Sequence, residues 1–238
     1  TINRLCGSGA QSVVSAAQLI MLGEAETVVA GGMENLSQSP HVLRDERTTY
    51  KLGRSPRKGE EIPRDMEDYF FTNLRDDVCG YFMAQTSDEL CKMLDVSRED
   101  ADSFAALSHQ RTENSIRNGI WEDEIVEVIT PEGVLDSSHD DHVVLGTTIE
   151  SLSGLRTHFG PDSLVTAGNA SGVVDGAAAI VVKSGARAKS DGDAPLSRIV
   201  SWGIVGLDPK IMAHGPVPSS NLALQKAGLK VEDIDLWE

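Results

Sequence analysis

The sequence predicts an α/β fold in which helices cover a largely parallel or mixed sheet, with one domain inserted into another. Two observations lead to this prediction. Helical hydrophobic periodicity alternates with short apolar runs of strand length, which is typical of layered α/β proteins. The amino-acid composition also changes twice along the chain. Residues 1–42 and 161–238 are rich in small apolar residues, whereas residues 43–160 carry most of the charge.

Residues 1–42 are predicted to form the end of a strand, then a helix, then a second strand. Thr1–Leu5 resembles the end of a strand. Gly9–Leu22 has apolar positions near the helical period, and Gly23 follows as a helix-terminating residue. Ala25–Ala30 reads as a short buried strand, which Gly31 and Gly32 end.

The rest of the chain predicts further elements of both kinds. Residues 44–66 are polar and contain prolines, so we expect an irregular surface loop. Helices are expected at Thr86–Leu94, from the capping pattern Ser97-x-x-Asp100 to Asn118, and at Ser219–Ala227. Strands are expected at Glu124–Ile129, Leu164–Ala167, Ala177–Lys183 and Leu196–Val205, and a further strand is expected to start at Asp233–Glu238.

Composition excludes several classes of protein. The 238 residues are 40% hydrophobic and carry 21 basic and 37 acidic side chains, for a net charge of −16. No apolar run approaches the roughly 18 residues of a membrane span, and no basic cluster supports nucleic-acid binding. Three cysteines and no secretion signal predict free thiols and a cytoplasmic location. The chain begins at Thr1, so we expect a processed chain or a part of a longer one.

Cys6 is the residue with the strongest chemical pattern. It lies in Arg4-Leu-Cys-Gly-Ser-Gly9, between a strand end and the start of a long helix. A helix N-terminus carries roughly half a unit of positive charge, which favours a reactive thiolate. The alternative is a buried structural cysteine in a glycine turn, and the local pattern leaves both interpretations open.

Other candidate groups are weaker. Cys79 and Cys91 read as small core residues, and no cysteine spacing fits a zinc site. The segment His139-Asp-Asp-His142 could bind a metal, but a solvated acidic loop is the favoured interpretation, so we expect no metal site. The segment Ala167–Gly172 follows an expected strand. It predicts either a ligand-binding turn that presents Ser171 or a tight structural turn.

Four segments in order resemble those of thiolases, which act on acyl-CoA thioesters. The first two are Asn3-Arg-Leu-Cys-Gly-Ser-Gly9 and Ala30-Gly-Gly-Met-Glu-Asn-Leu-Ser37. The third is Val165-Thr-Ala-Gly-Asn-Ala-Ser-Gly172 with Asp175-Gly-Ala-Ala178. The last runs from Arg198-Ile-Val-Ser201 through Gly206-x-Asp-Pro-x-x-Met212 to Gly215-Pro-Val-Pro218. These segments span nearly the whole chain.

The resemblance implies a partial thiolase-like fold of α-β-α-β-α layers with an inserted loop domain. Residues 1–42 and 173–194 would form part of the N-terminal domain. Residues 43–172 would be the loop domain that binds coenzyme A, and residues 195–238 would start the C-terminal domain.

The resemblance also implies an acyltransferase with Cys6 as its nucleophile. Cys6 would cleave 3-ketoacyl-CoA into acetyl-CoA and a shortened acyl-CoA, or catalyse the reverse condensation, through an acyl-cysteine. It implies coenzyme A thioesters as substrates, no permanently bound cofactor, fatty acid metabolism and a homodimer or homotetramer. Residues implied to contact coenzyme A are Leu74, Met83, Ser151, Phe159, Ala167, Ser171, Gly172, Val173 and Met212.

The resemblance further implies catalytic elements beyond Glu238, namely an Asn-Glu-Ala-Phe segment, a Gly-His-Pro segment and a Cys-x-Gly-Gly-Gly segment. We therefore expect this chain to be an internal part of a longer thiolase that is inactive by itself. The alternative is a non-catalytic acyl-CoA-binding relative. A ketoacyl synthase-type enzyme is disfavoured by the Gly168-Asn-Ala-Ser-Gly172 segment and by the long charged insert.

Overall fold

The computed structural model describes residues 1–43, 66–135 and 142–238. Most of the expected 44–66 loop therefore lies outside the described residues. The described chain divides into two compact units. Unit 1 comprises Thr1–Leu74, Val173–Leu207 and His214–Glu238, and unit 2 comprises Arg75–Gly172 and Asp208–Ala213. Helices and strands are both present, which confirms the predicted α/β class. The domain boundaries implied by the resemblance stay a prediction.

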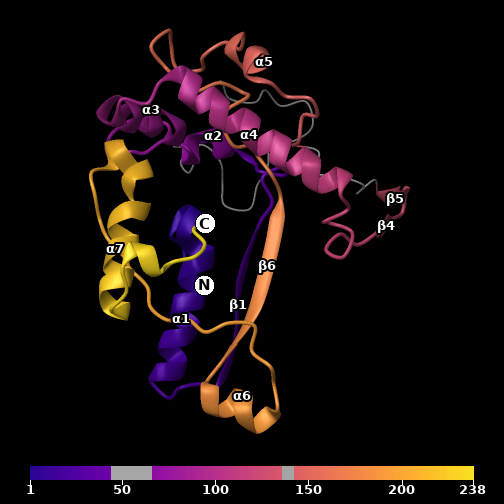
Figure 1. The fold of residues 1–238 in the computed structure, drawn as a ribbon, viewed down its shortest axis with the longest axis vertical. Helices are drawn as coiled ribbons and strands as arrows, with labels where there is room; N and C mark the ends of the chain where they lie inside the picture. Colours follow the sequence, from indigo (N-terminus) through magenta and orange to yellow (C-terminus); the bar gives the residue numbers. More distant parts are fainter. Residues whose placement is uncertain (44–65, 136–141) are drawn as a thin grey trace. The chain divides into compact units, whose positions relative to one another are not determined.

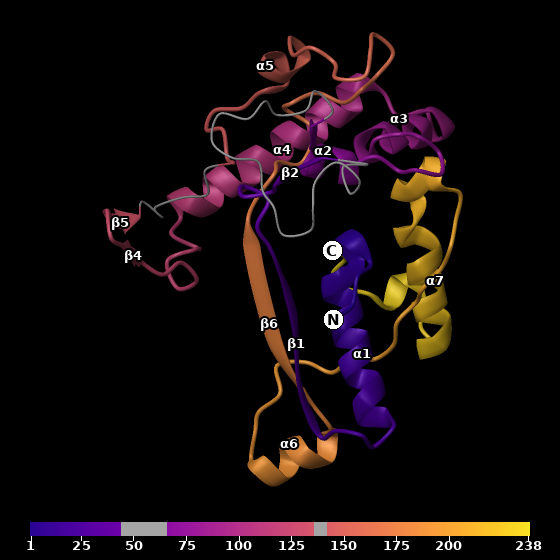
Figure 2. The ribbon, with the colours of Figure 1, turned by 180° about the vertical axis from the view of Figure 1, so that it is seen from behind.

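Unit 1 is built on a long antiparallel strand pair with a helix against it. Strand β1 (Thr27–Glu34) pairs along its whole length with β6 (Gly176–Lys183), with Ala30 opposite Ile180. Helix α1 (Ser8–Met21) contacts both strands, as Figures 1 and 2 show. Small buried residues lie on both sides of this contact, Ala16 and Ala17 on α1 and Ala30 on β1. Small side chains allow helix and sheet to pack closely.

The close pairing of β1 with β6 depends on Gly31. A Cβ atom at this position would lie 2.3 Å from Ala178 O and 2.9 Å from Ala179 Cα. Both are backbone atoms of the partner strand, so they cannot rotate away as a flexible side chain would. The neighbouring Gly32 has open space where its Cβ would be.

Unit 1 contains further short elements around this pair. They are the 3-10 turn η1 (Leu5–Gly7), the strands β2 (His41–Leu43) and β3 (Met66–Asp68), the helices α2 (Tyr69–Asn73), α6 (Gly185–Asp191) and α7 (Pro216–Ala227), and the turn η3 (Val231–Asp233). Strands β2 and β3 pair antiparallel. Helix α7 ends at Gly228, whose φ of 70° is the left-handed conformation that glycine adopts readily.

Unit 2 is mainly helical. It contains α3 (Met83–Leu94), α4 (Arg98–Arg117), α5 (Ile149–Ser153) and a hairpin of β4 (Val128–Thr130) with β5 (Gly133–Leu135). The turn η2 (Pro209–His214) lies largely in this unit. The predicted capping pattern before α4 is confirmed, because Ser97 Oγ accepts from Asp100 N and Ser97 N donates to Asp100 Oδ2. The Ser97 hydroxyl also donates to Asp100 Oδ2, and this bond, together with the one from Ser97 N, lowers the pKa of the Asp100 carboxyl.

The predicted helices are confirmed, and two of them begin three residues earlier than expected. Helix α3 starts at Met83 instead of Thr86, and α7 starts at Pro216 instead of Ser219. The strands at Ala25–Ala30 and Ala177–Lys183 correspond to β1 and β6. The prediction that Gly31 and Gly32 end a buried strand is wrong, because both glycines pair within the ladder, β1 continues to Glu34, and only Ala30 of β1 is buried. The strand expected at Glu124–Ile129 is shorter, because only Val128–Thr130 pairs in the hairpin.

The strand predicted at Leu164–Ala167 is wrong. Its amides donate to side-chain acceptors instead of to a neighbouring strand: Leu164 N to Asp88 Oδ1, and Thr166 N to Asn169 Oδ1. One isolated bridge, between Thr157 and Thr166, remains.

The strand predicted at Leu196–Val205 is also wrong. This segment forms no ladder with any part of the chain that the structure describes. It bonds instead to α7, where Ser201 Oγ donates to Ala223 O and Lys226 Nζ donates to Trp202 O. A Cβ atom on Gly203 would lie 2.0 Å from Ser219 O, so the backbone runs directly against the helix.

Both ends of the chain also differ from prediction. Neither the expected strand end at Thr1–Leu5 nor the expected strand start at Asp233–Glu238 forms a ladder with the described residues, and Leu5 and Asp233 lie in the turns η1 and η3. The strand pairs among the described residues are all antiparallel, so the expected parallel pairing is not found there. No helix in the described ranges is both long and apolar enough to cross a membrane.

Candidate active site

Cys6 lies in the turn η1, directly before the first turn of α1. It is exposed, so the alternative of a buried structural cysteine is not what the structure shows. The first amides of a helix have no partner within that helix, and their dipoles favour negative charge nearby. Cys6 therefore combines access to ligands with a position beside the positive end of a 14-residue helix.

The turn that carries Cys6 is strained. Leu5 has a φ of 51°, which lies in the left-handed region that a bulky residue rarely adopts. Local hydrogen bonds hold this conformation. Leu5 N donates to Asn3 Oδ1 (2.9 Å), and Ser8 Oγ accepts from Arg4 N (2.9 Å) and donates to Leu5 O (2.7 Å). Such strain is frequently found at functional sites, where surrounding contacts fix one geometry.

Two segments that resemble thiolases meet at the end of the β1–β6 pair. Asp175, just before β6, accepts from Ser37 N (2.9 Å) and from Ser37 Oγ (2.5 Å). These residues are 138 positions apart in sequence. The two bonds from Ser37 hold the pKa of the Asp175 carboxyl below its ordinary value, because they stabilise its charged form.

The Ser37–Asp175 contact predicts a pH-dependent stability. Because the native pKa of Asp175 is lowered, the contact stabilises the protein above the ordinary carboxyl pKa of about 3.9 and is lost as pH falls through the native pKa. Ser37→Ala in the complete protein should lower Tm at pH 7. That deficit should shrink in progressively acidic buffers, as thermal melts at a series of pH values would record.

Ser190→Ala is the matched control for this prediction. Ser190 Oγ donates to a backbone carbonyl, Arg187 O, and to no carboxylate in the described structure. Its effect on Tm should not vary with pH. An equal Tm deficit for Ser37→Ala at every pH would contradict the account of Asp175.

The segment that contains Ser171 forms a hydrogen-bonded turn in unit 2. Ala170 N donates to Thr166 O, and Asn169 binds the backbone on the N-terminal side of the turn. Ala167, Ser171 and Gly172 are exposed. The ring of His142 occupies the place where a Cβ atom on Gly172 would stand. A residue larger than glycine therefore fits at position 172 only if this ring moves.

The other residues implied to contact coenzyme A are distributed over both units. Ser151 is exposed on α5, Met83 begins α3, and half-buried Phe159 follows α5. The ring of Phe82, the residue before Met83, stacks on Phe159 with centroids 6.0 Å apart. Exposed Met212 lies in η2 of unit 2. Half-buried Leu74 and exposed Val173 lie in unit 1, as does Cys6.

Cys79 and Cys91 are half-buried and not fully buried in a core. Burial raises the pKa of the Cys91 thiol, and the nearby Asp88 carboxylate raises it further. In the described ranges, no group of three or more possible metal ligands comes together. His139, Asp140 and Asp141 lie outside those ranges.

Two groups of residues that shape these segments were not among the residues predicted from the sequence. Asn3 and Ser8 hold the Leu5 turn, and Arg98, Asp102 and Asn169 hold the segment before Ser171. One signal could have indicated part of the second group, because Arg98 and Asp102 lie four residues apart on a predicted helix, a spacing that allows an ion pair.

Two family models match this chain, "Thiolase, N-terminal domain" over residues 1–186 and "Thiolase, C-terminal domain" over residues 193–238. The chain is 41% identical to an acetyl-CoA acetyltransferase of Cupriavidus necator, covering 100% of this chain and 59% of the relative. It is 42% identical to a mitochondrial 3-ketoacyl-CoA thiolase of Homo sapiens, covering 100% of this chain and 58% of the relative.

A solved structure is also similar. The crystal structure of human mitochondrial 3-ketoacyl-CoA thiolase in complex with CoA matches with a TM-score of 0.86 and 40% identity, covering 99% of this chain and 57% of that one. The chain thus spans less than two thirds of the relatives that it matches, and the expected thiolase-like α/β fold is confirmed. Since the N-terminal model alone matches residues 1–186, the chain belongs to the thiolase family.

Proposed function

We propose that the complete protein containing this chain is an acyltransferase that cleaves 3-ketoacyl-CoA to acetyl-CoA and a shortened acyl-CoA, or condenses two acetyl-CoA molecules. The observation that carries the proposal is the exposed Cys6 in a strained turn at the N-terminus of α1. The names of the relatives, acetyl-CoA acetyltransferase and 3-ketoacyl-CoA thiolase, support the same chemistry.

Cys6 is the nucleophile in this proposal. Its sulfur attacks the 3-keto carbon, the bond between C2 and C3 breaks, and the electron pair leaves with the acetyl-CoA fragment, which takes up a proton. The acyl group stays on Cys6 as a thioester. The sulfur of a second CoA then attacks this thioester and releases the Cys6 sulfur. Covalent catalysis divides one difficult carbon–carbon step into two easier ones.

Coenzyme A contacts are proposed for nine residues. Ser171 and Gly172 lie in a turn whose backbone is fixed by Thr166 and Asn169, which suits recognition of a polar pantetheine arm. Contacts with coenzyme A are also proposed for the remaining seven residues, namely Leu74, Met83, Ser151, Phe159, Ala167, Val173 and Met212.

The substrates are proposed to be coenzyme A thioesters, with no permanently bound cofactor, in fatty acid metabolism. The complete protein is proposed to be a homodimer or homotetramer. A cytoplasmic location is proposed from the three free cysteines, which suit a reducing compartment. A relative of the same family is named as mitochondrial, so cell fractionation would decide between the two compartments.

A thiolysis assay tests the proposal. Purified complete protein is mixed with acetoacetyl-CoA and CoA, and the formation of acetyl-CoA is followed by chromatography. The proposal requires acetyl-CoA to form catalytically. A protein that binds CoA but gives no turnover in either direction would instead be a non-catalytic acyl-CoA-binding relative.

A further inference from the structure

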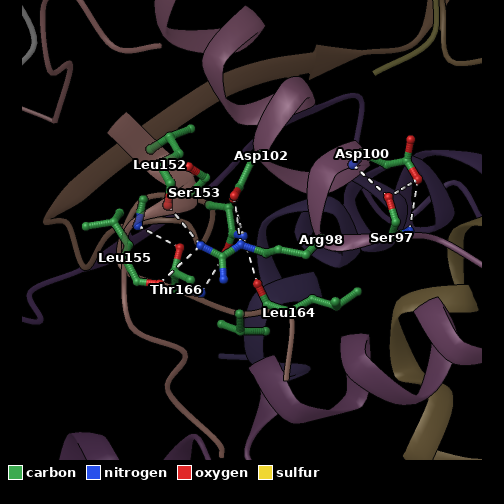
Figure 3. A network of polar contacts seen from close by, with 12 residues as sticks. Ser97, Arg98, Asp100, Asp102, Leu152, Ser153, Leu155, Leu164 and Thr166 are labelled. Carbon is green, nitrogen blue, oxygen red and sulfur yellow. Dashed lines mark hydrogen bonds and ion pairs between the residues drawn. The ribbon is translucent and has the colours of Figure 1, made fainter. Parts of the chain in front are cut away.

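An ion pair with a buried carboxylate lies on α4 in unit 2. Asp102 on α4 is 1% exposed, and its Oδ2 accepts from Arg98 Nε at 2.7 Å, one helical turn earlier (Figure 3). A buried carboxylate is costly unless it is paired and hydrogen-bonded, so each of its oxygens needs a partner. The second oxygen, Oδ1, accepts from Asn169 Nδ2 at 3.0 Å.

Asn169 connects this ion pair to the segment that carries Ser171. Its Nδ2 also donates to Leu164 O at 2.8 Å, and its Oδ1 accepts from Thr166 N at 2.8 Å. One amide group therefore closes the turn over residues 164–169 and anchors it to α4. Ser171 follows two residues later, so its position depends on this anchor.

Arg98 connects the same ion pair to α5, which carries Ser151. Its Nη2 donates to Leu152 O at 2.9 Å, in the last turn of α5, and to Leu155 O at 3.2 Å, just past the end of that helix (Figure 3). Carbonyls at a helix C-terminus carry partial negative charge, so a guanidinium is a suitable partner.

A second observation shows that the two segments pack tightly together. A Cβ atom on Gly168 would lie 2.5 Å from Leu152 Cδ2 and 2.6 Å from Leu155 Cδ1. The turn and the end of α5 are thus in contact, and Leu152 is 5% exposed. The polar network and this apolar contact fix the same pair of segments.

We propose that Arg98, Asp102 and Asn169 are positioning residues, which hold the Ser151 and Ser171 segments in one geometry for the pantetheine arm of coenzyme A. This inference rests on the proposed function, because it assumes that these segments bind CoA. The three side chains act through the backbone that they anchor and need not touch the ligand. A binding site ordered in advance loses less conformational entropy when the ligand binds.

The test uses two variants of the complete protein and one matched control. Asn169→Ala removes the amide that joins the turn to Asp102. Arg98→Lys keeps a positive charge beside Asp102 but removes the planar donors for the two carbonyls in and just after α5. The control Arg117→Lys makes the same change on the same helix, at an exposed side chain paired with Glu113. Thermal melts identify the variants that fold, and Arg98→Lys decides alone if Asn169→Ala does not fold.

The readouts separate binding from chemistry. Loss of this pre-ordering should raise the Kd for CoA, measured by titration calorimetry, roughly tenfold or more, and the KM for CoA in thiolysis should rise with it. The kcat and the alkylation rate of Cys6 by iodoacetamide should change little. Arg117→Lys should leave all four values close to those of the wild type. A general loss of structure would lower kcat and alter alkylation as well.

Two results would overturn the inference. Wild-type protein that binds CoA, together with folded Arg98→Lys and Asn169→Ala variants of unchanged Kd and KM, would show that the network has no role in binding. Wild-type protein that does not bind CoA would overturn the proposed function and this inference with it.

Discussion

Replacing Cys6 with alanine in the complete protein is expected to lower kcat for thiolysis by at least about 10³-fold, because the acyl group then has no sulfur to bond. The alanine fits the site, since Cys6 is exposed and its turn is held by Asn3 and Ser8. The variant should therefore fold and bind CoA like the wild type. Steady-state assays of acetyl-CoA formation, with calorimetric CoA titrations beside them, measure both effects.

Cys91→Ala is the matched control for this loss. Cys91 is half-buried on α3, and burial together with the Asp88 carboxylate raises the pKa of its thiol. It is a poor nucleophile at neutral pH for that reason. Its removal should leave kcat near the wild-type value. Full activity in Cys6→Ala would refute the assignment of the nucleophile.

Gly31→Ala is expected to cost about 3 kcal/mol or more of folding stability, the upper range for overpacking a tight site. The added Cβ would stand 2.3 Å from Ala178 O, so β1 and β6 would have to separate. Gly31 and Gly32 are adjacent in β1, which makes Gly32→Ala a control for any general effect of alanine on the strand.

The two variants should differ sharply in thermal melts of the complete protein. Gly31→Ala should melt far below the wild type or fail to accumulate in soluble form. Gly32→Ala has open space for its Cβ and should be neutral or slightly stabilising. Equal melting temperatures for the two variants would contradict the close pairing of β1 with β6.

The helices could be predicted well because their signals are local. Helix α1 shows the expected apolar period, and Ser97 and Asp100 cap α4 as their spacing predicts. Strands depend on pairing partners far away in sequence. Leu164–Ala167 has the residues of a strand, but its amides bond to the side chains of Asp88 and Asn169.

The candidate site could be predicted only in part for the same reason. The motif around Cys6 indicates a turn before a helix, and the structure places it there. The left-handed conformation of Leu5 could not be predicted, because it depends on the side chains of Asn3 and Ser8. The bond from Asn169 to Asp102 spans 67 positions, and nothing in a single sequence indicates such a contact.

The location of the acyl group during turnover decides directly whether Cys6 is the nucleophile. Complete protein is incubated with acetyl-CoA, quenched in acid, digested and analysed by mass spectrometry. We predict one acetyl group on the peptide that contains Cys6, none on the peptides of Cys79 or Cys91, and loss of the adduct when free CoA is added. Continued turnover with unmodified Cys6, or an acetyl group on another cysteine, would contradict the account.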